Sequence, residues 1–419
     1  MKMKKMTAVL SMILIMALLT ACTKKADTTE QTPSVQATEA AEAAGTEEKT
    51  EAAEAAGTEE KTEAAEAAGT EKTAEDAGAA ASEETGAPEA AEKSTEVSNK
   101  LFSITLPDKA AGLFVSEITE NGISIYDKEA KEAEFGGFAF NVSAYKEPSE
   151  YAGGMDSKVG EYRAADGTLY DIVVSYPSDV QYDYTKNTDG MPESYEMLYR
   201  GAEDIIKTLK GSDGSGEFIW GAGTKGEDLY GDVLKKHVQA VNEKWDANRL
   251  EEEGLSPEYY ALSVDGENVL EKVGYAYFDE NHDGVDELFI GVISDGDMKG
   301  VAYDIYTMVN RKPEHVVSGT ARNRYYALNS GMLVNEHSDG ANAEGWDIYD
   351  IEPNTTNLMD QVKMKIDRYE NEEKPWFVSY DNGETWESQD EKEFEDYKAN
   401  FSDYMRFDFT PLSSVQGAD

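Results

Sequence analysis

The stretch VGYAYFDENHDGVDELFIGVIS, residues 273–294, decides how the second half of this chain folds. Two apolar segments, VGYAYF and ELFIGVIS, flank an acidic loop, and both are rich in the β-branched and aromatic residues that favour strands. We therefore predict a strand–loop–strand unit. Its loop gathers several carboxylates beside a strand that is expected to be buried, and one explanation for such a concentration of negative charge is a bound cation.

The spacing of residues in this loop predicts a cation site. Oxygen-bearing side chains stand at the first, third and fifth positions, Asp279, Asn281 and Asp283, and a glycine, Gly284, follows at the sixth. A glycine permits the sharp turn that brings the next carbonyl oxygen, that of Val285, toward the same centre. Many flexible oxygen ligands without a phosphate-binding motif favour Ca²⁺ over Mg²⁺.

The loop is similar to the D-x-[DN]-x-D-G-x-x-[DE] calcium loops of FG-GAP and integrin-propeller repeats, which also lie between strands. This resemblance implies that Glu287, at the ninth position, completes the ligand set. An EF-hand or dockerin is excluded, because the twelfth position is Ile290 and strands flank the loop. The motif occurs once, so no propeller is expected. The alternative interpretation is a solvated hairpin of Asp, Asn and Gly residues without a metal.

The amino terminus predicts an exported protein. A basic start, MKMKK, precedes an apolar run that ends near residue 19 and is too short for a stable membrane span. Residues 19–22, Leu-Thr-Ala-Cys, resemble the lipobox of bacterial lipoproteins. The resemblance implies removal of a signal peptide, residues 1–21, and lipid on Cys22 that anchors the chain at the extracytoplasmic face of the cell membrane. The alternative is an ordinary secretory signal with an incidental cysteine.

Cysteine content and charge exclude several classes of function. Cys22 is the only cysteine, so a disulfide framework, a cysteine-ligated zinc site and a cysteine nucleophile are excluded. The net charge is −47, which disfavours nucleic acid and anionic lipid surfaces as partners. Cations, basic proteins and neutral ligands remain open, and the oligomeric state is not indicated.

The first half of the chain divides into a spacer and a predicted domain. Repeats of TEAAEAAGTEEK lie within residues 22–97, which offer too little apolar surface to offset the entropy of ordering and are therefore predicted to be a disordered spacer. Six strand-like segments and an amphipathic helix over 192–210 then predict an α+β domain at 98–210. This order of elements is similar to that of the PsbP/Mog1-like group.

A Gly- and Ser-rich stretch, 211–225, is predicted to be a linker to a second α+β domain at 226–411. We expect an antiparallel meander in this domain, with a helix at each end, over 229–250 and 390–405. Residues 412–419 are predicted to be a tail.

Residues 379–386, SYDNGETW, match the Asp-box S-x-D-x-G-x-T-W of sialidases and other exo-acting glycan enzymes. In those families the box is architectural and remote from catalysis. The match predicts a β-hairpin in which Asp381 binds local amides and Trp386 packs beneath the turn. Because no phosphate loop, HExxH or G-x-S-x-G motif is present, we assign no catalytic residue.

Taken together, the lipobox, acidic spacer and two α+β domains with mainly antiparallel sheets and packed helices resemble a largely uncharacterised group of surface lipoproteins from anaerobic Gram-positive bacteria. We expect a non-enzymatic protein, anchored to the membrane through Cys22, whose calcium-stabilised second domain binds an extracellular protein or glycan. The alternative is a glycan-processing extracellular hydrolase built around the Asp-box hairpin, so whether the chain is an enzyme stays open.

Overall fold

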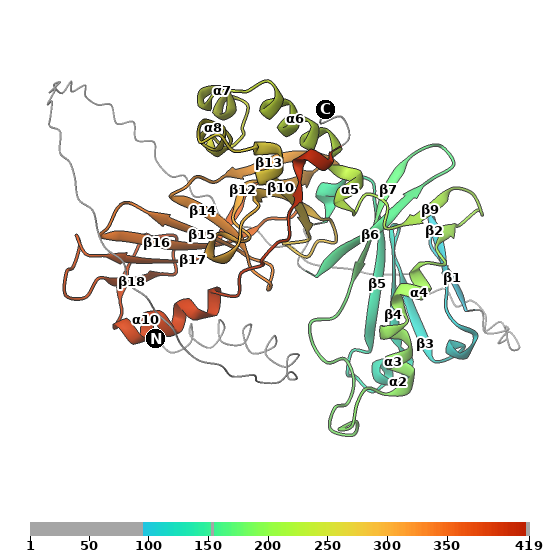
Figure 1. Ribbon diagram of the computed structural model, residues 1–419. Helices are drawn as coiled ribbons and strands as arrows, with labels where there is room; N and C mark the ends of the chain where they lie inside the picture. The colour runs from blue at the N-terminus through green and yellow to red at the C-terminus, as the bar shows by residue number, and fades with distance from the viewer. Residues whose placement is uncertain (1–94, 152–154, 416–419) are drawn as a thin grey trace, which may run out of the picture. The chain divides into compact units, whose positions relative to one another are not determined.

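The computed structural model describes residues 95–151 and 155–415 of the chain (Figure 1). The predicted signal peptide, Cys22 and almost all of the predicted spacer lie outside these residues. All described residues belong to one compact unit, residues 84–419. Within the described part, the helices pack on three sheets in which every strand pairing is antiparallel, and this confirms the predicted α+β class.

The N-terminal sheet region, residues 96–220, contains a six-stranded and a three-stranded sheet. The six strands lie in the order β3-β4-β5-β7-β6-β9, and the three lie in the order β1-β2-β8. The bounds of these strands are β1 (Glu96–Ser98), β2 (Phe102–Thr105), β3 (Phe114–Ile118), β4 (Gly122–Asp127), β5 (Phe138–Tyr145), β6 (Asp156–Arg163), β7 (Leu169–Ser175), β8 (Lys210–Gly211) and β9 (Glu217–Trp220). The helices are η2 (Asp108–Ala110), α2 (Lys128–Glu132), η3 (Pro148–Glu150), α3 (Glu193–Arg200) and α4 (Ala202–Ile206).

The predicted helix over 192–210 forms as two helices, α3 and α4, which meet at Gly201. The predicted apolar face is buried as expected, at Tyr195, Leu198, Ala202, Ile205, Ile206 and Leu209. These side chains join strand residues in one apolar core, and Figure 1 shows the two helices lying across the sheet that contains β4 and β5.

The predicted linker at 211–225 differs from the structure. Gly211 pairs with Phe102 at the end of β8, and β9 pairs with β6 at the edge of the six-stranded sheet. The Gly- and Ser-rich residues therefore form the turn between β8 and β9, and the N-terminal sheet region continues to Trp220. The partners of these strands lie far away in the sequence, so local turn signals alone suggested a linker.

The C-terminal sheet region, residues 226–415, contains an eleven-stranded antiparallel sheet. Its order is β19-β18-β17-β16-β15-β14-β12-β11-β10-β20, with β13 paired to β12, so the predicted meander forms over most of its length. The strand bounds are β10 (Val273–Phe278), β11 (Glu287–Val292), β12 (Ala302–Val309), β13 (Lys312–Ser318), β14 (Asn323–Ala327), β15 (Leu333–Ser338), β16 (Ala343–Ile351), β17 (Leu358–Asp367), β18 (Trp376–Ser379), β19 (Glu387–Ser388) and β20 (Thr410–Pro411).

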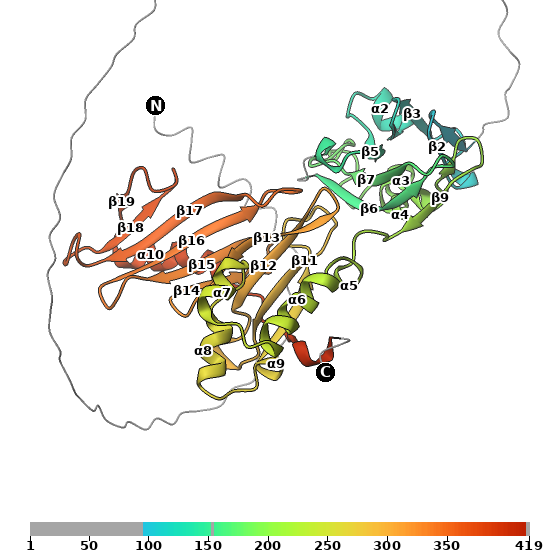
Figure 2. The same ribbon diagram turned by 90° about the horizontal axis from the view of Figure 1, so that it is seen from above.

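The helices of this region are shorter than the sequence pattern predicts. Their bounds are α5 (Gly226–Leu229), α6 (Gly231–Asn242), α7 (Ala247–Glu252), α8 (Glu258–Val264), α9 (Val269–Lys272), η4 (Gly296–Met298), α10 (Glu391–Lys398), η5 (Ala399–Phe401) and η6 (Leu412–Ser414). The helix predicted over 229–250 is broken after α6, because Lys244 takes a φ of +54° and Asp246 starts α7 by accepting a hydrogen bond from Arg249 N at 2.9 Å. Figure 2 shows α6–α9 grouped beside β11–β13.

The predicted tail at 412–419 is partly integrated into the fold. Leu412 is fully buried in the core formed by α6, α9 and β10, and β20 immediately before it pairs with β10. Sequence reasoning did not detect this pairing, because β20 is only two residues long and its partner lies more than a hundred residues earlier.

Candidate cation site in the β10–β11 loop

The acidic loop joins β10 to β11, as the sequence predicts. The two strands pair from Val273 with Val292 to Phe278 with Glu287, so the eight residues between them form the connection. β11 lies inside the eleven-stranded sheet, and Leu288, Phe289 and Ile290 are fully buried. The loop therefore lies at the end of a hairpin whose second strand, β11, is buried in the core, and its conformation affects both strands.

The side chains at the first, third and fifth loop positions fold back onto the loop's own backbone. Asp279 Oδ2 accepts a hydrogen bond from Gly284 N at 3.1 Å, Asn281 Oδ1 accepts from Asp283 N at 3.0 Å, and Asp283 Oδ1 accepts from Val285 N at 2.9 Å. Gly284 takes a φ of +85°, which provides the predicted sharp turn. The loop is thus curled around the side chains that the sequence proposes as ligands.

Two polar atoms of this curl are buried without a partner in the described structure. They are Asp279 Oδ1 and Asn281 Nδ2. Buried polar atoms are normally satisfied by hydrogen bonds, by water or by an ion. An unpartnered carboxylate oxygen beside two oxygen-rich neighbours is therefore what a hard cation such as Ca²⁺ would satisfy.

Glu287 closes the loop from its far end. Its side chain is fully buried, its Oε2 accepts from Glu280 N at 2.8 Å, and its Oε1 accepts from Thr307 Oγ1 at 3.0 Å. Each carboxylate oxygen has a second lone pair, so both contacts leave capacity for a cation. Val285, whose carbonyl oxygen is the fifth predicted ligand, has a buried side chain.

The electrostatics of the loop oppose ionisation of its carboxyl groups. Burial raises the pKa of Asp283 to about 7, and the negative charge of Asp279 adds to the effect. Burial also raises the pKa of Glu287 well above its ordinary range, with Asp283 as the next cause, and burial raises the pKa of Asp279. A bound cation would relieve this repulsion, because it favours the charged form of each carboxylate.

The side-chain arrangement also sets a limit on the cation interpretation. Within residues 95–151 and 155–415, no group of three or more His, Cys, Asp or Glu side chains has an arrangement that could hold a metal ion. The three carboxylates of the predicted site, Asp279, Asp283 and Glu287, are therefore not gathered into such a group, and a cation in the loop would also need the Asn281 amide oxygen and the Val285 carbonyl oxygen. These donors suit Ca²⁺, and the structure brings Asp279, Asn281, Asp283, Val285 and Glu287 into one curled loop.

Glu280 is the loop residue whose role the sequence did not indicate. Its side chain is fully buried, its Oε1 has no partner among the described residues, and its Oε2 accepts only a long bond from Ile351 N at 3.4 Å. Burial raises its pKa well above the ordinary value, and Asp350 is the next cause. The alternation of predicted ligand and non-ligand positions along the loop did not indicate this burial, because the strand that covers Glu280, β16, lies about seventy residues later in the sequence.

The backbone of the loop contacts the N-terminal sheet region. Lys158 N on β6 donates to the carbonyl oxygen of Asp283 at 2.6 Å, and a Cβ on Gly284 would lie 2.2 Å from the Lys158 carbonyl oxygen. The glycine is therefore required for this close approach as well as for its positive φ. His282, by contrast, is exposed, as its even loop position predicts.

The Asp-box forms the predicted hairpin between β18 and β19. Ser379 Oγ donates to Asp381 Oδ1 at 2.9 Å, and Thr385 N donates to the same oxygen at 2.8 Å. Trp386 lies next to Gly383 at the turn. These contacts are internal to the hairpin, so they explain its shape and assign no chemistry to it.

Comparison with known proteins finds no family model, curated protein or solved structure that matches this chain significantly. Within the part of the chain that the structure describes, no helix is long and apolar enough to cross a membrane. The residues of the loop themselves are therefore what supports a function.

Proposed function

We propose that this chain is a lipid-anchored cell-surface protein whose C-terminal sheet region is stabilised by Ca²⁺ and binds an extracellular protein or glycan without catalysis. The proposal of an anchor is supported by the lipobox-like residues that end at Cys22. The proposal of calcium is supported by the curled, oxygen-rich loop that ends the β10–β11 hairpin.

One observation carries the calcium proposal: Asp279 buries a carboxylate oxygen, Oδ1, without a partner among the described residues, inside a loop of buried carboxylates. The ligands would be the side chains of Asp279, Asn281, Asp283 and Glu287 and the carbonyl oxygen of Val285. The cation would supply the positive charge that these groups lack. It would thereby hold the ends of β10 and β11 together near one edge of the sheet.

Thermal unfolding of the detergent-solubilised full chain tests this proposal. We expect the melting temperature to fall in EDTA and to return when excess CaCl₂ is added, because a ligand that binds only the folded state stabilises it. Asp279→Asn should weaken the response to calcium. Asp295→Asn, which alters an exposed acid outside the loop, should respond like the parent chain. The same melting temperature in EDTA and in calcium would overturn the calcium proposal.

Aromatic side chains of the C-terminal sheet region could contact an extracellular ligand only where they are exposed to solvent. Tyr325, Tyr326 and Trp346 are buried and belong to the core, whereas Trp376 and Trp386 are partly exposed near the β18–β19 hairpin. A screen of immobilised glycans and cell-surface proteins against the parent chain and a Trp386→Ala variant would test whether this edge binds a ligand. Unchanged binding in the variant would place the ligand elsewhere.

The alternative, a glycan-processing hydrolase, has the Asp-box hairpin in its favour. Glycoside hydrolysis requires two carboxyl groups about 5–10 Å apart on either side of the scissile bond. Release of reducing sugar from a panel of glycans by the purified chain would favour this alternative over a binding function.

A further inference from the structure

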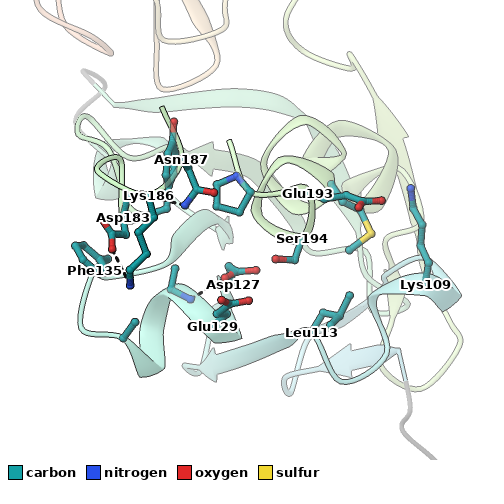
Figure 3. Close-up of a pocket in the computed structure, with 15 residues that line it drawn as sticks. Lys109, Leu113, Asp127, Glu129, Phe135, Asp183, Lys186, Asn187, Glu193 and Ser194 are labelled. Atoms are coloured by element: carbon teal, nitrogen blue, oxygen red, sulfur yellow. Dashed lines mark hydrogen bonds and ion pairs between the residues drawn. The ribbon is translucent and has the colours of Figure 1, made fainter. Parts of the chain in front are cut away.

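The N-terminal sheet region contains a pocket that neither the calcium loop nor the Asp-box explains. Its volume is about 570 Å³, and it lies between α2, the start of α3 and the loop before α3 (Figure 3). We call it the α2 pocket. A volume of this size lies within the range of small-molecule sites.

Asp127, at the end of β4, is a buried acid that lines this pocket. Its Oδ1 accepts a hydrogen bond from Ala130 N at 2.8 Å and so caps α2. Its Oδ2 is buried without a partner among the described residues, and the whole residue is only 1% exposed. A buried carboxylate oxygen without a donor is costly, so this atom indicates a missing positively charged or hydrogen-bonding partner.

The other ionisable groups make the pocket electronegative. Asp183 and Lys186 form an ion pair at 3.0 Å and offset each other. Glu129 and Glu193 make no ion pair or hydrogen bond with another described side chain. Together with Asp127 they outnumber Lys109, the remaining basic residue of the lining. Figure 3 shows the carboxyl groups of Asp127 and Glu129 next to each other.

Apolar side chains are exposed in the same lining. Leu113 is 44% exposed and Phe135 is 38% exposed, and both lie in the wall of the pocket. Large apolar side chains that stay exposed inside a concave site are typical of ligand pockets. The lining thus combines a negative charge with an apolar surface, which fits a molecule with a positive group and an apolar body.

We propose that the α2 pocket binds a small organic cation, an amine whose ammonium group donates to Asp127 Oδ2 while its apolar part packs against Leu113 and Phe135. The neighbouring Glu129 carboxylate adds to the attraction. This proposal is independent of the calcium site, because it uses residues of the N-terminal sheet region alone.

Ligand-observed NMR with the full chain tests the proposal, with 2-phenylethylamine as the probe. Its neutral and anionic analogues, 2-phenylethanol and 3-phenylpropionate, have a similar apolar part. We expect the amine to bind and the two analogues to bind at least about tenfold more weakly, since a hydrogen bond to a charged group is the stronger kind. Equal binding of all three probes, or no binding of the amine, would overturn the proposal.

Two variants separate the pocket from general charge effects. Asp127→Asn keeps the oxygen that caps α2 and removes the charge at Oδ2, so amine binding should weaken by about tenfold or more. Glu132→Gln removes an equal charge from the same helix outside the pocket and should leave amine binding unchanged. Circular dichroism checks that both variants are folded. If both substitutions weakened amine binding equally, net charge alone would explain the binding, and Asp127 would not be the residue that binds the ammonium group.

Discussion

At the scale of single residues, Gly284 determines the shape of the acidic loop. Its positive φ strains any other L-residue, and its hydrogen atoms face the main chain of Lys158 at a distance that excludes a Cβ. Both constraints involve backbone atoms, so rotation of a side chain cannot relieve them. The predicted ligand positions depend on this one residue.

Gly284→Ala should therefore lower the free energy of unfolding by about 2–4 kcal/mol, from the left-handed φ and the backbone clash together. Gly296→Ala is the matched control, because Gly296 has a φ of +67° and no neighbour within 4 Å of its Cβ position. The control should lose only about 1–2 kcal/mol. Urea unfolding in EDTA measures both variants, and equal losses would contradict the importance of the contact.

His237 on α6 is a second residue whose environment has a measurable consequence. It is fully buried, and its ring contacts the hydroxyl groups of Tyr259 at 2.9 Å and Tyr306 at 3.0 Å. Burial lowers the pKa of His237 to about 4. The ionisable groups that face it are Asp304, which acts in the opposite direction, and His315 and Lys236, which lower the pKa of His237 further.

Because the folded-state pKa of His237 is lower than its ordinary value of 6.5, the unfolded chain takes up the proton first as the pH falls. This contribution to stability is fully present above pH 6.5 and is lost as the pH falls toward 4, by about 3 kcal/mol in total. Urea unfolding at several pH values should show a shallower acid dependence for His237→Gln than for the parent chain. Parallel curves would contradict this prediction.

At the scale of elements, the β18–β19 hairpin is held by two side chains, Ser379, whose Oγ accepts from Gly383 N at 2.8 Å, and Asp381. Besides its two bonds to Oδ1, Asp381 accepts a bond at Oδ2 from Thr385 Oγ1 at 2.6 Å, and these bonds hold its pKa below the usual value. The strand pairing of the hairpin is only two residues long on the β19 side. The turn therefore depends on Asp381 more than on the strands.

Asp381→Ala should open this hairpin locally without unfolding the sheet. We expect faster amide hydrogen exchange over residues 379–388, because the turn loses three bonds and β19 lies at the edge of the sheet. Glu384→Ala, an exposed substitution in the same turn, should leave exchange unchanged. Similar exchange in the two variants would show that the Asp-box residue is not what holds the turn.

At the scale of the whole molecule, a buried ion cluster connects the two sheet regions of the compact unit. Asp171 on β7 is 1% exposed, and its Oδ1 lies 3.0 Å from Lys158 Nζ and 3.1 Å from Arg311 Nε. Arg311 belongs to the turn between β12 and β13 and also donates to the Lys146 carbonyl oxygen at 3.0 Å. The same strand, β6, supplies the backbone contact to the acidic loop.

Asp171→Ala should lower the free energy of unfolding by about 3–5 kcal/mol, because it leaves the buried Lys158 without this partner. Asp396→Ala is the control, since its ion pair with Lys392 is exposed and such pairs contribute at most about 1 kcal/mol. Denaturant unfolding followed by intrinsic fluorescence measures both. A loss below about 1 kcal/mol for Asp171→Ala would contradict a stabilising role of the cluster.

The sequence alone was sufficient for features that depend on local patterns. The β-branched and aromatic residues on both sides of the acidic loop predict the β10–β11 hairpin, and the helical spacing of Tyr195 and Leu198 predicts the buried face of α3. These predictions hold because each depends on the composition or the period of its own segment. The order of donors in the acidic loop is likewise local, and it curls as its spacing implies. Whether it holds calcium is still a prediction.

Only the tertiary structure decided the features that join distant segments. The pairing of β9 with β6, the burial of Glu280 beneath β16 and the contact between Lys158 and Asp283 bring together residues that are between about sixty and well over a hundred positions apart. The unpartnered oxygen of Asp127 is another feature that only the tertiary structure revealed, because the segments that form its pocket contain no recognisable sequence motif. Sequence patterns report the orientation of a side chain within its element, whereas burial and pairing depend on what the rest of the chain places against it.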